Sequence, residues 1–222
     1  MAKPTWTDRL NTVVNVVVIL FILLVLFRPG GLASTEIGKL RKGSSDRQAI
    51  AGVWPRLVQG ARPLAPPAAG ADRMVVEFSD YECPFCRTAH KTLPGALGDA
   101  GGATLVYRHL PLSSIHPQAD PAARAAVCAE KQGRFPQMHA HLFETEGWRK
   151  DPDWGREALA VGITDTTSFR TCLSDTATSR RLAEDRLLAE RLKIKATPTF
   201  VSVNGTHLGV VTGADLKKIL ER

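Results

Sequence analysis

The segment EFSDYECPFCRTAH, residues 77–90, contains two of the four cysteines of this 222-residue chain. Cys83 and Cys86 are three positions apart, a spacing found in redox couples, in half of a metal site and in short structural disulfides. The apolar run Met74–Phe78 before them is typical of a buried strand, and residues 84–98 after them are expected to form a helix. The cysteine pair is therefore predicted to lie between a strand and the start of a helix.

The position of Cys83 at a helix start favours its ionised form. Unpaired backbone N–H groups and the helix dipole stabilise an anion there, and thiolate is the reactive form of cysteine. Pro84 suits the first helical turn, where no N–H is needed. Cys86 follows on nearly the same helical face, within reach of a disulfide. A redox pair is favoured over zinc, which usually takes two spaced pairs of ligands, because Cys128 and Cys172 are isolated.

A second motif, KATPTF at residues 195–200, places Pro198 just before a predicted strand. The Thr197–Pro198 bond could be cis, a state that is common only before proline. A cis-proline loop beside the cysteine pair would present the backbone groups of Thr197 to a substrate strand. The alternative is an ordinary proline at the start of a strand.

The remaining elements are inferred from hydrophobic runs and turn residues. Pro94 is expected to kink or end the first helix. The Asn204–Gly205 step is a strong hairpin signal. In order, the expected elements are a strand at 103–108, helices within 119–194, strands at 199–203 and 207–211, and a helix at 214–220.

The N-terminal region contains a long apolar segment followed by a spacer. Residues 10–27 carry no formal charge, and a spanning helix needs ~20 largely apolar residues. We expect an uncleaved transmembrane helix; a cleaved signal segment or a buried core helix are the alternatives. Residues 28–71 are rich in Gly, Pro and Ala and are expected to form a linker. Apolar residues at helical spacing in 50–58 indicate a short helix that Pro55 interrupts.

The charge of the chain does not indicate a nucleic-acid partner. The formal net charge is +7 and 44% of the residues are hydrophobic. Lys and Arg are scattered among Asp and Glu, and no basic run with interleaved aromatic residues occurs. We therefore expect no nucleic-acid binding.

The segments VVEFSDYECPFC and ATPTFVSVNG, with this order of elements, resemble the DsbA-like branch of the thioredoxin superfamily over residues 72–222. AARAAVCAEKQGRF and MHAHLF resemble the helical insertion of that branch. The resemblance implies an α/β, thioredoxin-like fold with an inserted helical domain, here preceded by one N-terminal transmembrane helix. The expected organisation is a tail at 1–9, an anchor at 10–27, a linker at 28–71, the first half of the fold at 72–118, the insertion at 119–194 and the second half at 195–222.

The resemblance also assigns roles to individual residues. It implies that Cys83 is the exposed nucleophile, that Cys86 is the buried resolving cysteine, and that Pro198 is a cis-proline preceded by Thr197. Glu77 matches the buried acid behind the disulfide. A buried carboxyl could relay a proton to or from Cys86; the alternative is a carboxylate paired with Lys or Arg.

One position departs from the resemblance. Strongly oxidising members carry His between the cysteines, whereas this chain has Phe85. A phenyl ring supplies no hydrogen bond to a thiolate, so the direction of electron flow stays open. Together with Pro84, Phe85 is expected to contribute to substrate binding next to the Thr197–Pro198 loop.

The other two cysteines lie in different predicted helices of the insertion. Cysteines outside the cytosol tend to pair, so Cys128 and Cys172 are expected to form a structural disulfide. Two separate buried thiols are the alternative.

These features predict a thiol–disulfide oxidoreductase of the inner or cytoplasmic membrane, single-pass, facing the periplasm or exterior. It would act on cysteine-containing protein substrates, most simply as a disulfide donor reoxidised by a membrane redox partner. It needs no cofactor and no resident metal, because the cysteines themselves carry the electrons. A reductase or isomerase is one alternative. Another is a copper- or zinc-handling protein that holds the metal with Cys83, Cys86 and a nearby His.

Overall fold

The computed structural model describes residues 6–27, 46–60, 62–64 and 73–221 of the chain. The chain divides into two units, Met1–Asp46 and Arg47–Arg222. In the first unit, α1 (Trp6–Phe27) is a continuous helix of 22 residues. The second unit contains a five-stranded sheet, the helices that cover it and a helical insertion.

The membrane anchor expected at residues 10–27 is not supported. Within the part of the chain that the structure describes, no helix combines the length and the apolar character needed to cross a membrane.

The sheet of the second unit combines parallel and antiparallel pairs. Strands β2 and β3 are parallel, and the three other pairs, β1–β3, β2–β4 and β4–β5, are antiparallel. From Val75 onward β2 is fully buried, as is all of β3, which agrees with the apolar runs that predicted them. In spatial order the strands are β1 (Arg62–Pro63), β3 (Thr104–His109), β2 (Met74–Ser79), β4 (Thr199–Ser202) and β5 (Gly205–Leu208).

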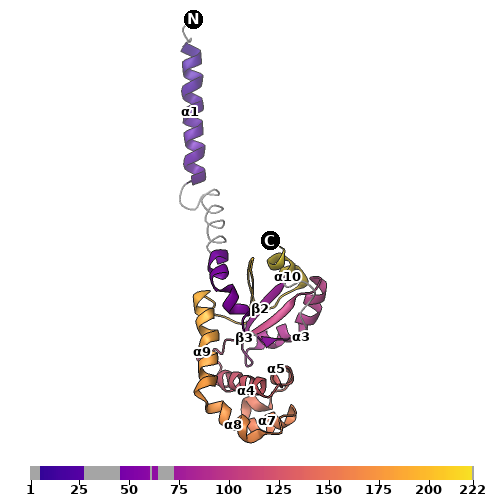
Figure 1. Ribbon diagram of the computed structural model, residues 1–222. Helices are drawn as coiled ribbons and strands as arrows, with labels where there is room; N and C mark the ends of the chain where they lie inside the picture. The colour runs from indigo at the N-terminus through magenta and orange to yellow at the C-terminus, as the bar shows by residue number, and fades with distance from the viewer. Residues whose placement is uncertain (1–5, 28–45, 61, 65–72, 222) are drawn as a thin grey trace. The chain divides into compact units, whose positions relative to one another are not determined.

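Helices cover both faces of this sheet. Figure 1 shows α3 (Pro84–Asp99) and α10 (Gly213–Leu220) on one side and α9 (Thr176–Arg191) on the other. Leu93 of α3 and Leu216 of α10 pack with Phe200 of the sheet in one apolar cluster. Helix α3 runs through Pro94 instead of ending there, because buried residues on both sides of the proline hold it against the sheet.

Part of the expected linker belongs to the folded unit. Residues 46–58 form a helix that continues through Pro55, and Ile50 and Leu57 are buried in the cluster on the α9 face of the sheet. The second unit of the chain begins at Arg47.

Arg108 of β3 fixes the end of this helix. Its buried guanidinium donates to the backbone oxygens of Arg56 at 2.6 Å, Leu57 at 3.0 Å and Gln59 at 2.8 Å. It also pairs with Asp185 of α9 at 2.6 Å. The last carbonyls of a helix have no partner within it, so Arg108 acts as a cap supplied by another element.

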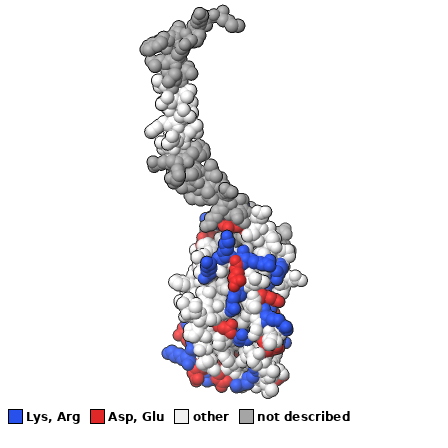
Figure 2. All heavy atoms as spheres, turned by 90° about the vertical axis from the view of Figure 1, so that its left-hand side faces the viewer, with Lys and Arg blue, Asp and Glu red and all other residues white. Residues whose placement is uncertain are grey.

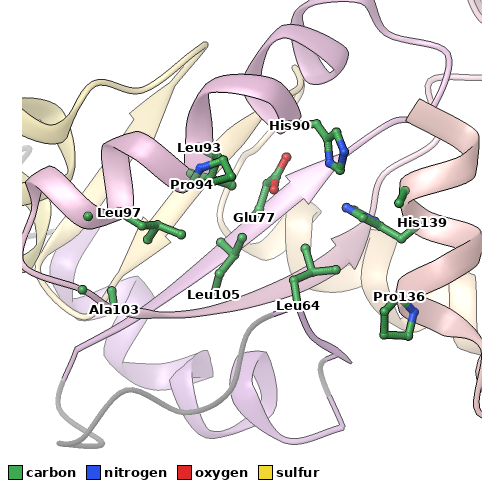
Figure 3. A pocket seen from close by; sticks show the side chains of 13 residues that line it. Leu64, Glu77, His90, Leu93, Pro94, Leu97, Ala103, Leu105, Pro136 and His139 are labelled. Carbon is green, nitrogen blue, oxygen red and sulfur yellow. The ribbon is translucent and has the colours of Figure 1, made fainter. Parts of the chain in front are cut away.

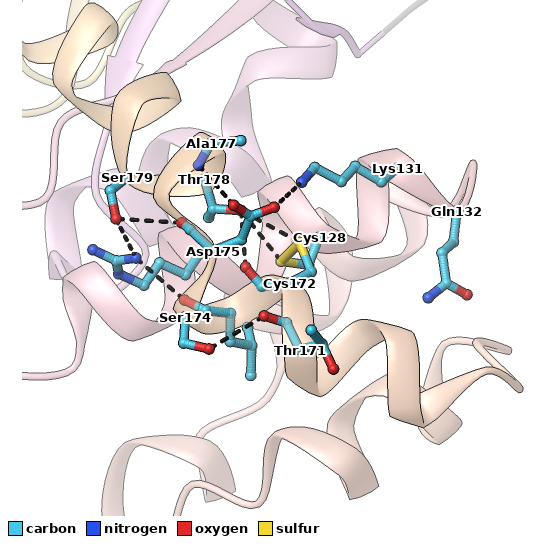
Figure 4. Close-up of a disulfide and its surroundings, with 12 residues drawn as sticks. Cys128, Lys131, Gln132, Thr171, Cys172, Ser174, Asp175, Ala177, Thr178 and Ser179 are labelled. Carbon is cyan, nitrogen blue, oxygen red and sulfur yellow. Dashed lines mark hydrogen bonds and ion pairs between the residues drawn. A yellow bond between two sulfur atoms is a disulfide. The ribbon is translucent and has the colours of Figure 1, made fainter.

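The helical insertion groups at one end of the sheet (Figure 1). A disulfide joins Cys128 of α4 to Cys172 of α8, 44 residues apart in sequence, with the Thr178 hydroxyl beside both sulfurs (Figure 4). Within the insertion, the helices before α9 are α4 (Ala119–Lys131), α5 (Phe135–Glu144), α6 (Gly147–Lys150), α7 (Trp154–Ala160) and α8 (Thr166–Ser174).

The C-terminal hairpin is present, but its turn differs from the prediction. Ser202 pairs with Gly205, so Val203 and Asn204 form the two-residue loop. The Asn204 backbone N–H donates to the Ser202 hydroxyl, and its side chain donates to the Leu220 carbonyl at 3.1 Å. These contacts hold the turn against α10. Gly205 therefore begins β5 and does not lie in the turn, as the Asn204–Gly205 signal had predicted.

The surface of the second unit carries charges of both signs. On the face shown in Figure 2, acidic and basic side chains are interspersed with uncharged ones. This distribution agrees with the scattered charges of the sequence.

Candidate active site

Cys83 is the N-cap residue of α3, and its backbone is extended (φ −70°, ψ 125°). Pro84 occupies the first turn, and Cys86 lies one turn into the helix. Both cysteines are free thiols here. The strand-to-helix position predicted for the pair is therefore the one observed.

The burial of Cys83 differs from the expectation of an exposed nucleophile. The residue is only 4% exposed and Cys86 is 0% exposed, whereas Phe85 between them is 64% exposed. The loop of Thr197 contributes to this cover, because the Cys83 thiol lies 3.5 Å from the Thr197 carbonyl oxygen. Among the residues of the motif, Pro84 and Phe85 thus present the accessible surface.

The two thiols have opposite acidities. A hydrogen bond from Cys86 is the main cause that lowers the pKa of Cys83 to about 5. Burial, followed by the interaction with Cys83, raises the pKa of Cys86 well above that of an ordinary thiol. At neutral pH the pair therefore holds one thiolate, on Cys83, and one proton, on Cys86.

The Thr197–Pro198 peptide bond is cis, and both residues are buried. The Gly209 N–H donates to the Pro198 carbonyl at 2.8 Å. Gly209 has a φ of 95°, which glycine adopts without steric cost. This contact secures the loop while the Thr197 carbonyl faces Cys83.

Glu77 lies in β2, between Tyr107 of β3 and Phe200 of β4. It is 2% exposed, and this burial raises its pKa to about 7. Among the described residues, no Lys or Arg forms an ion pair with Glu77. The pairing considered as an alternative for this carboxyl is thus not seen in the described part of the chain.

Asp80 holds the segment before the cysteines in place. It was not predicted as a site residue. Its carboxylate accepts from the backbone N–H of Glu82 at 2.8 Å and of Leu112 at 2.9 Å, and it pairs with His116 at 2.7 Å. The Asp80 backbone N–H lies 3.5 Å from the Cys86 sulfur. Its place three residues before Cys83, where Asp often bonds nearby backbone groups, was the available signal.

The described ranges contain no group of three or more His, Cys, Asp and Glu side chains that is arranged to hold a metal ion.

The arrangement can perform thiol–disulfide exchange. One sulfur is an anion at neutral pH and its neighbour keeps its proton. The loop of Thr197 lies beside the first sulfur. An exchange reaction needs a thiolate that attacks or leaves and a second sulfur that closes or opens the disulfide. The structure brings Cys83, Cys86 and Thr197 together, whereas Glu77 has no hydrogen bond to either sulfur among the contacts of the described residues.

Comparison with known proteins places this geometry in a family. A family model described as thioredoxin matches residues 68–222. A thioredoxin-like oxidoreductase from Silicibacter pomeroyi DSS-3 is similar in structure, with a TM-score of 0.61 and 32% identity, covering 68% of this chain and 86% of that one.

Two curated relatives have different names. The chain is 38% identical to the Na(+)/H(+) antiporter NhaA 3 of Salinispora tropica, covering 59% of this chain and 20% of that protein. It is 27% identical to the probable disulfide bond formation protein D of Bacillus anthracis, covering 67% of this chain and 72% of that protein. The chain spans about a fifth of the length of the first curated relatives that it matches.

Proposed function

Since this chain belongs to the thioredoxin family, we propose that it is a DsbA-like thiol–disulfide oxidoreductase that donates a Cys83–Cys86 disulfide to protein substrates outside the cytosol. The observation that carries this proposal is the placement of Cys83 at the start of α3, with the free Cys86 thiol one turn on and the Thr197–Pro198 loop beside it. This placement agrees with a pKa of Cys83 that is lowered to about 5. A pair whose reduced form is stabilised as a thiolate gives up its disulfide readily.

The proposed reaction proceeds in two exchanges. A substrate thiolate attacks the Cys83 sulfur of the disulfide; the Cys83–Cys86 bond breaks, and Cys86 leaves and takes a proton. The second substrate thiolate then attacks the substrate sulfur of the mixed disulfide and releases Cys83 as a thiolate. Two substrate thiols become one disulfide, and their two electrons remain on the cysteine pair.

The acidities fit this order of events. The raised pKa of Cys86 makes it the sulfur that takes up a proton, and the lowered pKa of Cys83 makes it the better final leaving group. We assign Glu77 as the proton donor, because with a pKa of about 7 it is partly protonated at neutral pH.

Substrate recognition is assigned to the rim of the site. The exposed Phe85 and Pro84 provide an apolar contact, and the Thr197 backbone provides hydrogen bonds to an extended substrate strand. Because the Thr197 carbonyl contacts Cys83 in the free protein, a substrate must take the place of this contact to reach the sulfur.

The location outside the cytosol is supported by the Cys128–Cys172 disulfide, since structural disulfides persist mainly in oxidising compartments. Repeated turnover as a donor requires an acceptor for two electrons, which we assign to a membrane redox partner. The Bacillus anthracis relative is named a probable disulfide bond formation protein, which also favours the donor direction.

The equilibrium of the pair with glutathione tests the proposal. We expect a strongly oxidising pair, and reduced substrate peptides should acquire disulfides at a rate that Cys83→Ser abolishes. Cys86→Ser, supplied with the oxidised peptide, should accumulate a mixed disulfide, because the Cys83 thiolate attacks the peptide disulfide and no second thiol of the pair resolves it. A thioredoxin-like equilibrium with active disulfide reduction would instead assign a reductase or isomerase.

A further inference from the structure

A cavity of about 480 Å³ lies between α3, α5 and the central strands (Figure 3). Its volume falls in the range of small-molecule sites, roughly 300–1,000 Å³. Most of its lining is apolar and comes from four parts of the fold: Leu64 after β1, Leu93, Pro94 and Leu97 of α3, Leu105 of β3 and Pro136 of α5.

Three titratable side chains meet at one part of this cavity. Figure 3 shows Glu77 of β2 with His90 of α3 and His139 of α5 beside it. The two imidazole centroids are 5.2 Å apart. Burial lowers the pKa of both histidines, so they are neutral at pH 7. Glu77 therefore faces imidazole rings and apolar side chains but no positive charge among the residues that line the cavity.

We propose that this cavity binds amphipathic primary amines, with the ammonium group on Glu77 and the apolar body against α3 and α5. A buried carboxylate is costly unless it is paired with a cation, and none of the lining side chains supplies one. A ligand amine brings the missing charge, and the leucines and prolines take up its hydrocarbon part. The site shares Glu77 with the proposed thiol exchange, but amine binding itself requires neither cysteine.

Amine binding has a protonic signature. Glu77 is about half protonated at pH 7, so an arriving ammonium group releases up to about half a proton per ligand, because opposite charge favours the carboxylate. The other titratable groups nearby change little: the histidines are already neutral, and burial keeps Tyr107 protonated. Glu144 and Lys91 act on His90 from α5 and α3.

Isothermal titration of the full chain tests the site with a matched pair of probes, phenethylamine and phenethyl alcohol. We expect the amine to bind about tenfold more tightly, since a hydrogen bond to a charged group is worth about 1.4 kcal/mol more than a neutral one. Buffers of different ionisation enthalpy should report the released proton. Equal affinity for the two probes, or no release, would overturn the proposal.

Three variants locate the binding. Glu77→Gln should remove both the preference for the amine and the proton release. Ala140→Phe, on the α5 wall, should fill the cavity and abolish binding of both probes while Cys83 alkylation is unchanged; retained binding would place the site elsewhere. Cys83→Ser should bind the amine like the unmodified chain, so that this test is independent of exchange activity.

Discussion

Cys83 is the residue whose ionisation decides the chemistry of the site. In the reduced protein, the rate of its alkylation by iodoacetamide should be constant around neutral pH and fall to half near pH 5, because the thiolate is lost as the pH drops through its lowered pKa of about 5. The rate is measured from pH 3 to pH 9 by mass spectrometry.

Cys86→Ala is the matched variant for this measurement. It removes the hydrogen bond that is the main cause of the low pKa, so the half-point should move toward the ordinary thiol value of about 8.5. The same half-point in both proteins would contradict the role given to Cys86.

Glu77 should make stability depend on pH. Its pKa is raised from 4.5 to about 7 in the folded state, so stability is fully present below pH 4.5 and declines as the pH rises to 7. Glu77→Gln should remove this decline and stabilise the protein at pH 8 by up to about 3 kcal/mol, since each tenfold change in proton affinity is worth about 1.4 kcal/mol.

Urea unfolding at pH 5 and pH 8 measures this effect. His116→Gln serves as a control for a titratable group near the site that is bound to Asp80 instead. A pH dependence of stability that is identical in Glu77→Gln and the unmodified protein would show that another group causes it.

Asp80 should be required to hold the segment before the cysteines. Asp80→Asn replaces one carboxylate oxygen by an NH₂ group, so the bond from Glu82 N–H to Oδ1 and the bonds from Leu112 N–H and His116 to Oδ2 cannot all be kept. A buried donor left without a partner costs about 1–3 kcal/mol. Asp153→Asn is the matched control, because this exposed helix cap tolerates asparagine. Equal stability losses in the two variants, measured by urea unfolding, would contradict the role of Asp80.

Among the elements, those with continuous apolar runs could be predicted from the sequence. Strands β2 and β3 are buried on both faces, and their runs of apolar residues show it directly. The hairpin turn could not be placed, because the bond from the Asn204 side chain to Leu220 depends on where α10 packs. This tertiary contact outweighs the local turn preference of Asn204–Gly205.

The helix at residues 46–58 was predicted only in part for a similar reason. Pro55 is a local signal against a helix, and the apolar spacing around it does not show whether the helix continues through the proline. The contacts that stabilise the helix end come from Arg108, 51 residues after Leu57. A pairing over such a distance leaves no periodic pattern in the sequence.

The disulfide between α4 and α8 should stabilise the insertion. Replacing Cys128 and Cys172 together by Ala should lower the free energy of unfolding by about 4 kcal/mol, as expected for the 44-residue separation of the pair. Thermal and urea unfolding measure the loss. Cys83 alkylation serves as the control, because its site lies outside the bond, and an unchanged unfolding free energy would contradict a structural role.

The folded unit as a whole should need its N-terminal helix. A chain that starts at residue 46 is expected to unfold cooperatively, whereas one that starts at residue 72 loses the apolar contacts of Ile50 and Leu57 and leaves Arg108 without its carbonyl partners. Arg108 keeps its ion pair with Asp185, but a buried donor left without its acceptor costs about 1–3 kcal/mol, and more when the donor is charged. Equal melting temperatures of the two truncations would disprove the contribution of this helix.

The cysteine chemistry of the molecule was easier to predict from the sequence than the accessibility of the Cys83 sulfur. Cys83 and Cys86 are recognisable from their spacing, and Pro198 from its place before a strand. The cover over Cys83 was not predictable, because it involves Thr197, 114 residues away. Only the closed sheet, which sets β4 beside β2, brings that loop to the cysteines.

This cover has a consequence for the lifetime of the protein in an oxidising environment. An acidic thiolate is readily driven by peroxides to sulfinic and sulfonic acids, which cannot be recovered by exchange. With 4% of Cys83 exposed, peroxide meets a shielded sulfur, and any sulfenic acid formed lies next to Cys86, which can condense with it to the disulfide. Oxidation of Cys83 by peroxide thus ends at the Cys83–Cys86 disulfide, the form that the proposed donor function uses.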